Sequence, residues 1–340
     1  MKTKIHGGAK RARFGVLALL SICSGLGALA FLIKIADWKS LLTIYKALSW
    51  SMLLVALFCY GTTWIFRVGR FRLFLETGGQ DISAPGIFAV LISGFGLNAF
   101  LPGKAGEVAT IIFLRWKGIA GSTALAAVIQ ARILDLLALL TLMSTAGLPT
   151  ALQLSAAPYS RAVLAGAGLL TIAPMLFMAL DRRQTLERFI EKMYRKPLLS
   201  ATAKTLHKFL VAYRRICLNG RLLAATGLFS LFIWTGEGMV AWFITKAAAI
   251  PASLSVCLLA VSLGNLGKAI PLTPGGVGVY EAIMAAVLHG AGLDWGSAVA
   301  VALADHLLKK TCSIGIGLPL AVHLVGDRGW SWLAWKEEKT

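Results

Sequence analysis

The chain has 340 residues, of which 57% are hydrophobic and 14% are charged, and its mean hydropathy is +0.75. Soluble domains carry about 25% charged residues, so the composition excludes a soluble enzyme and indicates an all-α, polytopic integral membrane protein. The formal net charge of +19 comes from basic residues that flank the apolar segments. This pattern is typical of a topology signal, and we expect no nucleic-acid partner.

The first two predicted spans cover residues 14–33 and 48–66. The run at 14–33 follows a basic N-terminus, and its about 20 residues are enough to cross a bilayer. We therefore expect a retained helix rather than a cleaved signal peptide. Arg67, Arg70 and Arg72 follow the second run, and we interpret them as the start of a cytoplasmic loop.

The region 84–118 contains two shorter apolar limbs around a break. The break has the sequence Pro102-Gly103-Lys104-Ala105-Gly106-Glu107. Broken backbone at membrane depth is tolerated only against protein or a water-filled cavity, and an ionisable residue beside it is a candidate functional residue. We predict a helical hairpin, whose limbs are either re-entrant or cross the membrane fully, since hydropathy does not distinguish the two.

Two long apolar runs, 121–147 and 158–180, complete the first half, and a basic stretch at 181–221 follows. The basic stretch has helical spacing, which indicates an amphipathic helix on the membrane surface or a soluble connecting helix. Its charge favours the cytoplasmic side. The predicted organisation is one transmembrane domain, 1–340, with half-repeats at 1–180 and 222–340 and a basic linker at 181–221.

The second half repeats this plan, with a span at 222–246, a hairpin at 252–290 and a final span at 295–323. The second break has the sequence Pro274-Gly275-Gly276-Val277-Gly278-Val279-Tyr280-Glu281. Charge counting places the N-terminus and the linker in the cytoplasm, so the two hairpins enter from opposite faces. The sequence therefore predicts an inverted repeat in the cytoplasmic (inner) membrane.

Spacing supports the repeat. Glu107 is followed 25 positions later by Arg132, and Glu281 is followed 25 positions later by His306. Asp135 and Lys309 each lie three residues further on, which places each pair on one face of a helix. We interpret the match as an internal duplication.

Each break frees backbone N–H and C=O groups and starts a helix whose N-terminus favours an anion. Two interpretations of each break therefore stay open. The break is either a binding site for a phosphate or carboxylate, or a structural kink whose polar groups hydrogen-bond to one another. Asn98 and Asn265 either satisfy these groups or contact substrate. Glu107 and Glu281 cap a helix, pair with a cation, or act as a proton- or cation-linked switch. Glu237, between two glycines, predicts close helix contact with a polar partner.

Several classes of chemistry have no sequence signal. The histidines lack HxxxH spacing, the cysteines lack CxxC spacing, and there is no GxxxxGK[ST] loop. We expect no metal, no cofactor and no set of catalytic residues.

The two breaks also resemble a known family. The pattern Asn98-x-x-x-Pro102-Gly103-x-x-Gly106-Glu107, with Arg115 eight residues on, and the pattern Pro274-Gly275-Gly276-x-Gly278-x-x-Glu281 are similar to the flippase-like membrane domain of lysylphosphatidylglycerol synthases. That domain is the lipid-translocating half of the multiple peptide resistance factor. The resemblance covers about 14–323 and implies passage of a lipid or lipid-linked headgroup between leaflets, without ATP hydrolysis by this chain. We expect a stand-alone member without the synthase domain.

We therefore predict a flippase for an anionic phospholipid or lipid-linked headgroup, with membrane lipids as its partners. The alternatives are a membrane-embedded lipid-modifying enzyme and a non-transporting scaffold that binds a lipid-synthesis enzyme. The candidate headgroup-binding residues are Asn98, Pro102, Gly103, Lys104, Gly106, Glu107, Arg115, Arg132, Asp135, Glu237, Asn265, Lys268, Pro274, Gly275, Gly276, Gly278, Glu281, His306 and Lys309.

Overall fold

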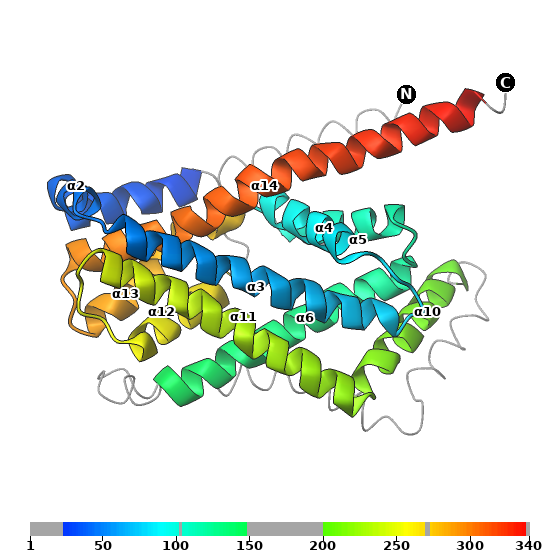
Figure 1. Cartoon of the computed structure of the whole chain (residues 1–340), viewed down its shortest axis with the longest axis horizontal. Helices are drawn as coiled ribbons and strands as arrows, with labels where there is room; N and C mark the ends of the chain where they lie inside the picture. The colour runs from blue at the N-terminus through cyan, green and yellow to red at the C-terminus, as the bar shows by residue number, and fades with distance from the viewer. Residues whose placement is uncertain (1–22, 102–103, 148–199, 269–272, 338–340) are drawn as a thin grey trace, which may run out of the picture.

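The computed structural model of the chain describes residues 23–101, 104–147, 200–268 and 273–337 (Figure 1). The regular elements of these residues are helices, which confirms the all-α class. The predicted span at 158–180 lies outside the described residues, as do residues 14–22 of the span at 14–33 and the two residues Pro102 and Gly103. The rest of the span at 14–33 belongs to an apolar helix, Cys23–Ala36.

Among the described residues, four long helices have the length and composition to cross a membrane. They are α3 (Trp50–Glu76), α6 (Gly121–Leu142), α11 (Gly220–Ala247) and α14 (Trp295–Glu337). They confirm the spans predicted at 48–66, 121–147, 222–246 and 295–323. A π-helical turn, Met143–Gly147, extends α6, and α14 continues well past the rest of the bundle (Figure 1).

Both predicted hairpins are present. The first consists of α4 (Ala84–Leu97) and α5 (Ala105–Trp116), and the second of α12 (Leu254–Gly267) and α13 (Val279–Gly290). Their limbs have 14 and 12 residues in each case. At 1.5 Å per residue these limbs reach about 21 and 18 Å, short of the about 30 Å of hydrocarbon that a crossing helix spans. This length favours the re-entrant form over full crossing.

The two halves run in opposite directions. Helices α3 and α11 pack side by side and antiparallel, and the Ser49 N–H at the start of α3 donates to the carbonyl of Ala247 at the end of α11 (2.9 Å). The hairpins enter the bundle from opposite ends (Figure 1). Their tips meet, since a Cβ added to Gly275 would lie 3.3 Å from the Cα of Ala99. The fold is therefore an inverted repeat with its hairpin tips at the centre.

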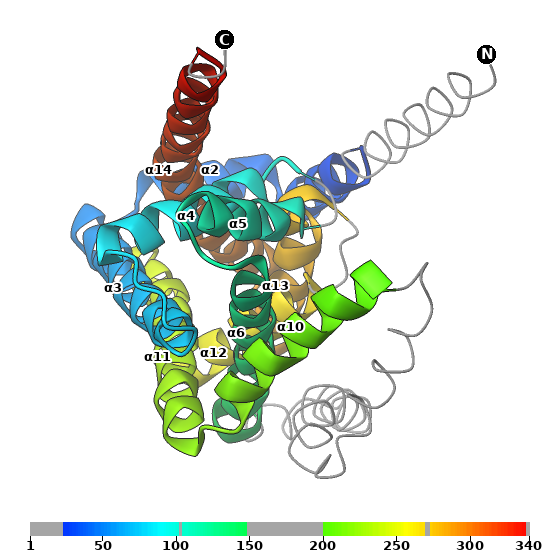
Figure 2. The same ribbon diagram turned by 90° about the vertical axis from the view of Figure 1, so that its right-hand side faces the viewer.

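The described part of the basic linker is an amphipathic helix, and its position relative to the membrane stays a prediction. Its helix α10 (Ser200–Cys217) packs against α6, and Leu210, Tyr213 and Ile216 are buried there. The helix lies along one side of the bundle (Figure 2). Its apolar face is therefore covered by protein, and its basic residues lie on the other face.

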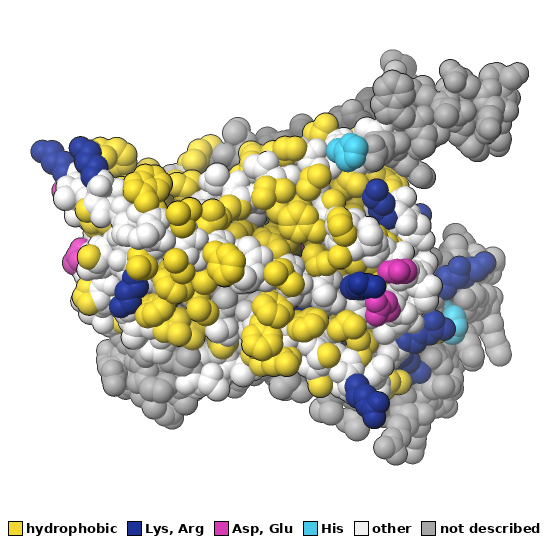
Figure 3. Space-filling model, viewed as in Figure 1, with side chains coloured by type: hydrophobic (Ala, Val, Ile, Leu, Met, Phe, Trp, Pro, Cys, Tyr) yellow, Lys and Arg dark blue, Asp and Glu magenta, His cyan; other side chains and the backbone are white. Residues whose placement is uncertain are grey.

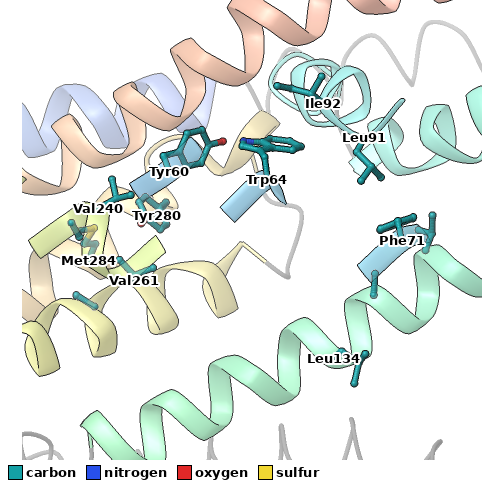
Figure 4. Close-up of a cluster of buried hydrophobic side chains, with 14 of the residues drawn as sticks. Tyr60, Trp64, Phe71, Leu91, Ile92, Leu134, Val240, Val261, Tyr280 and Met284 are labelled. Atoms are coloured by element: carbon teal, nitrogen blue, oxygen red, sulfur yellow. The ribbon is translucent and has the colours of Figure 1, made fainter. Parts of the chain in front are cut away.

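The interior and the outer surface are both apolar. Buried side chains from both halves form the core, among them Tyr60 and Trp64 of α3 and Met284 of α13 (Figure 4). On the outside, α3 exposes Trp50 by 79% and Phe58 by 72%. In Figure 3 the hydrophobic side chains cover the middle of the visible face, and charged side chains lie mostly toward its two ends. Exposed apolar area of this extent suits a lipid environment.

Candidate functional site

Two arginines that we assigned to a cytoplasmic loop lie inside the bundle instead. Helix α3 continues ten residues beyond the predicted end of the span, and it buries Arg67 and Arg70, which are 4% and 2% exposed. Of the three arginines, Arg72 alone lies at the surface, in an i, i+4 pair with Glu76. The loop interpretation of Arg67 and Arg70 was therefore wrong, because each has a buried carboxylate partner on another helix.

Arg67 is the centre of the first ionic cluster. Its Nη2 lies 2.5 Å from Oε1 of Glu237 on α11, and the other oxygen of that carboxylate lies 2.8 Å from Nζ of Lys309 on α14. Lys309 also pairs with Asp305 (2.8 Å), which accepts a hydrogen bond from the hydroxyl of Tyr280 (2.6 Å). The cluster thus joins α3, α11, α14 and the second hairpin.

Aromatic rings surround the Arg67 guanidinium. Its carbon lies 5.1 to 5.8 Å from the ring centroids of Phe95, Trp64 and Trp234. The guanidinium of Arg132 lies 5.8 Å from the same Phe95 ring. Ring faces attract cations, so these contacts further stabilise two positive charges in the protein interior.

Asp135 organises the second ionic cluster. Its Oδ1 accepts hydrogen bonds from Arg70 (2.6 Å) and from the indole N–H of Trp234 (3.0 Å). Its Oδ2 lies 3.4 Å from Arg132, which also pairs with Glu107 of the first hairpin (2.9 Å). The Arg132 and Glu107 side chains are 36% and 21% exposed, so this pair is the accessible part of an otherwise buried cluster.

The polar groups at the breaks are partly satisfied by the protein itself. Asn98 accepts a hydrogen bond from the freed N–H of Gly106 (2.8 Å). In the second hairpin, Glu281 accepts from the N–H of Gly278 (2.8 Å) and contacts Nδ1 of His306 (2.6 Å). Asn265 donates to a carbonyl one turn back in its own helix. These contacts hold the breaks in place and match the structural alternative for these residues.

A cavity of about 250 Å³ lies between the two hairpin tips. Its charged lining residues are Arg67, Lys104, Glu107, Arg132, Asp135, Lys268 and Lys310. Phe95, Leu101, Leu136, Leu139 and Trp234 form its apolar walls. The cavity is thus a cationic chamber inside an apolar protein, bounded by both halves of the repeat.

Nine of the predicted site residues line this cavity. They are Asn98, Lys104, Glu107, Arg132, Asp135, Asn265, Lys268, Gly275 and Gly276. Glu237 and Lys309 lie behind it, linked through Arg67. The hairpin breaks themselves contain Gly106, Pro274, Gly278 and Glu281, and His306 on α14 contacts Glu281. Arg115 is exposed at the outer end of α5 and does not line the cavity.

Sequence analysis missed several lining residues. Arg67, Phe95, Leu101 and Trp234 gave no local signal, and Lys310, which we did not include among the candidates, lines the cavity beside Gly275. Within the described part of the chain, no group of three His, Cys, Asp or Glu side chains is arranged to hold a metal ion.

Comparison with known proteins gives the family. The glycosyltransferase AglD of Haloferax volcanii is 26% identical over 331 residues, which cover 87% of this chain and 53% of AglD. The chain therefore spans about half the length of that relative. A UPF0104 membrane protein of Pyrococcus horikoshii is 25% identical over 279 residues, which cover 76% of this chain and 82% of the relative.

A family model described as the lysylphosphatidylglycerol synthase TM region matches residues 15–314. The match covers both hairpins and the helices that carry the two ionic clusters. Together with the four long apolar helices, it identifies a multi-pass membrane protein with a function related to membrane lipids. The chain belongs to the family of the lysylphosphatidylglycerol synthase transmembrane region.

Proposed function

We propose that the protein is a lipid translocase, which moves the anionic headgroup of a phospholipid or lipid-linked intermediate between leaflets. The observation that carries this proposal is the cationic cavity between the two hairpin tips. A headgroup crossing about 30 Å of hydrocarbon needs a polar site part of the way, and the acyl or prenyl chains remain in the bilayer.

The inverted hairpins supply a route for alternating access. One hairpin reaches the cavity from each end of the bundle, so small movements of either one expose the cavity to one side. The accessible Glu107–Arg132 pair gives a trigger. A phosphate that pairs with Arg132 displaces Glu107, and this releases the first hairpin from α6.

The alternative function is a membrane-embedded enzyme that modifies a lipid, and it is considered because AglD is named a glycosyltransferase. It would use Glu107 or Glu281 as a general base. Both oxygens of Glu281 are engaged, and Glu107 is paired with Arg132, so neither is a free base in this state. These contacts favour transport of a lipid over a reaction that modifies the lipid. In the scaffold alternative, a lipid-synthesis enzyme would bind the chain and the cavity would be idle.

The test is reconstitution of the purified protein in vesicles with fluorescent anionic lipids, followed by a membrane-impermeant quencher. We expect the quenched fraction to exceed that of protein-free vesicles, and Lys268→Gln to reduce it. Lys39→Gln, at an exposed position on α2 (Trp38–Lys46), is the matched control and should behave like the native protein.

Three outcomes separate the alternatives. Movement of chemically unchanged lipid supports the translocase. A lipid of altered mass supports the enzyme. A folded protein that moves and alters no lipid across a panel of anionic headgroups refutes both and favours the scaffold.

We also propose that the protein lies in the cytoplasmic (inner) membrane with its N-terminus in the cytoplasm. The basic linker helix α10 supports this orientation, since positive loops favour the cytoplasmic side. Protease cleavage of an N-terminal tag in inverted but not in right-side-out vesicles is the expected result.

A further inference from the structure

The charges around the cavity do not balance. The cations of the cavity wall and the two ionic clusters are Arg67, Arg70, Lys104, Arg132, Lys268, Lys309 and Lys310. The carboxylates are Glu107, Asp135, Glu237 and Asp305. Seven cations thus face four carboxylates in the described residues. The excess is therefore three positive charges. Counting Glu281 as a fifth carboxylate lowers the excess to two if its neighbour His306 is neutral, and a protonated His306 cancels that change.

The excess is concentrated on three lysines. Arg67, Arg132 and Lys309 each have a carboxylate partner. Arg70 is paired with Asp135 in the same way. In the described residues, no carboxylate lies within ion-pair distance of the remaining three cations, Lys104, Lys268 and Lys310. All three side chains are partly buried, and an ammonium that is partly removed from water without a counter-ion favours the binding of an anion.

The three lysines come from three different elements and converge on one space. Lys104 precedes α5 at the first hairpin tip, and Lys268 follows α12 at the second. Lys310 lies on α14, with its Nζ 2.8 Å from the position of a Cβ on Gly275. The ammonium of Lys268 also lies over the Tyr280 ring, 4.0 Å from its centroid. An anion held here would therefore join both hairpins to the long helix.

From this imbalance we infer that the preferred headgroup is a lipid phosphomonoester or diphosphate, which carries about two or more negative charges. The inference rests on the proposed function and narrows its substrate class. A phosphodiester such as phosphatidylglycerol supplies one charge and leaves two of the three lysines unmatched. An aminoacylated headgroup adds ammonium groups to a wall whose carboxylates are already paired.

The size of the cavity agrees with a compact group. Its about 250 Å³ lies below the roughly 300–1,000 Å³ of sites for drug-sized ligands. Phosphates fit such a space better than a large glycan does. Leu101, Leu136 and Leu139 form an apolar wall on which the first carbons of a lipid chain can pack.

Binding of short-chain probes to the purified protein in detergent tests the inference, with tryptophan fluorescence as the signal because Trp234 lines the cavity. The probes are farnesyl phosphate, farnesyl diphosphate, dihexanoyl phosphatidylglycerol and inorganic pyrophosphate. We expect the two farnesyl compounds to bind at least about tenfold more tightly than the phosphodiester, the difference expected for one further charge-assisted hydrogen bond.

The lysine variants connect this preference to the cavity. Lys268→Gln and Lys310→Gln should each weaken farnesyl diphosphate binding about tenfold and phosphatidylglycerol binding less. Lys268→Arg should retain most of the affinity, and Lys39→Gln should leave it unchanged. Retained gel-filtration and melting behaviour shows that a variant is folded.

Equal affinity for the farnesyl compounds and phosphatidylglycerol overturns the inference, as does tight binding that no lysine variant weakens. Pyrophosphate binding as tight as that of farnesyl diphosphate overturns the lipid assignment and indicates a soluble anion. The vesicle assay separates the two proposals. Movement of phosphatidylglycerol but not of a prenyl diphosphate refutes the inference alone, whereas tight diphosphate binding without movement of any lipid refutes the translocase alone.

Discussion

Glu237 is the carboxylate on which the buried cations of both halves converge, and Glu237→Gln is a direct test of the ionic cluster. One oxygen contacts Arg67 at 2.5 Å and the other contacts Lys309 at 2.8 Å. The side chains of Glu237, Arg67 and Lys309 are 9%, 5% and 11% exposed. Glutamine preserves the shape of the side chain but removes its charge.

The expected effect is large because the two orphaned cations, Arg67 and Lys309, are only 5% and 11% exposed. Removing one partner of a buried ion pair destabilises a protein by about 3–5 kcal/mol. We expect Glu237→Gln to lower the free energy of unfolding by about this amount. Glu76→Gln is the matched control on α3, where the Arg72–Glu76 pair is about half exposed. There the loss should stay below about 1 kcal/mol.

Unfolding in mixed micelles, followed by helical circular dichroism, measures both variants. Adding Arg67→Met to Glu237→Gln removes the orphaned guanidinium and leaves Lys309 paired with Asp305. The double variant should therefore lose less than the sum of the two single losses. If Glu237→Gln and Glu76→Gln have equal effects, or if the two buried substitutions add, the cluster does not hold the halves together as we argue.

Two further predictions use the same unfolding measurement. Gly106→Ala would place a Cβ 2.6 Å from Oδ1 of Asn98, so we expect a loss of about 1–3 kcal/mol, whereas Gly61→Ala in open space on α3 should be neutral or stabilising. Asp294 accepts a hydrogen bond from the N–H of Ser297 at the start of α14, and Asp294→Ala should cost about 1 kcal/mol. Hydrogen bonds from Ser297 lower the pKa of Asp294 below its usual 3.8, so this difference should be full at neutral pH and shrink as the pH falls through that lowered pKa.

The long helices and the hairpins could be predicted because their signals are local. Runs of apolar residues indicate spans, and Gly and Pro mark the breaks. The end of α3 was placed ten residues early because Arg67 and Arg70 read as a basic loop. Their partners, Glu237 and Asp135, lie 170 and 65 positions away in the sequence. Hydropathy does not detect such distant pairing, so the centre of the site was missed.

The 25-residue spacing corresponds to a contact between side chains as well as to equivalent positions in the two halves. Glu107 and Arg132 form an ion pair, and their counterparts Glu281 and His306 are in hydrogen-bond contact, with the partners 25 positions apart in each half. The same spacing therefore corresponds to the same contact between the second limb of a hairpin and the long helix that follows it. The spacing did not predict how far each pair is exposed to solvent. The side chains of Glu281 and His306 are each only 5% exposed, whereas the Glu107–Arg132 pair is accessible.

The Arg67–Glu237 pair gives a physical reason for the halves to differ in sequence. Helices α3 and α11 begin at Trp50 and Gly220, so Arg67 and Glu237 occupy equivalent positions, each 17 residues along its helix. Two identical charges at this contact would repel each other strongly in a dry interior. Opposite charges turn the same close approach into an attraction that joins the halves.

The two hairpins also differ in how accessible their side-chain pairs are. The second hairpin is closed by a buried pair, whereas the first is held by a pair that an incoming phosphate can reach. If the first hairpin is the element that releases on binding, a disulfide that ties α5 to α6 should block lipid movement, and one that ties α13 to α14 should have a smaller effect. Equal inhibition by both would show that the hairpins move together.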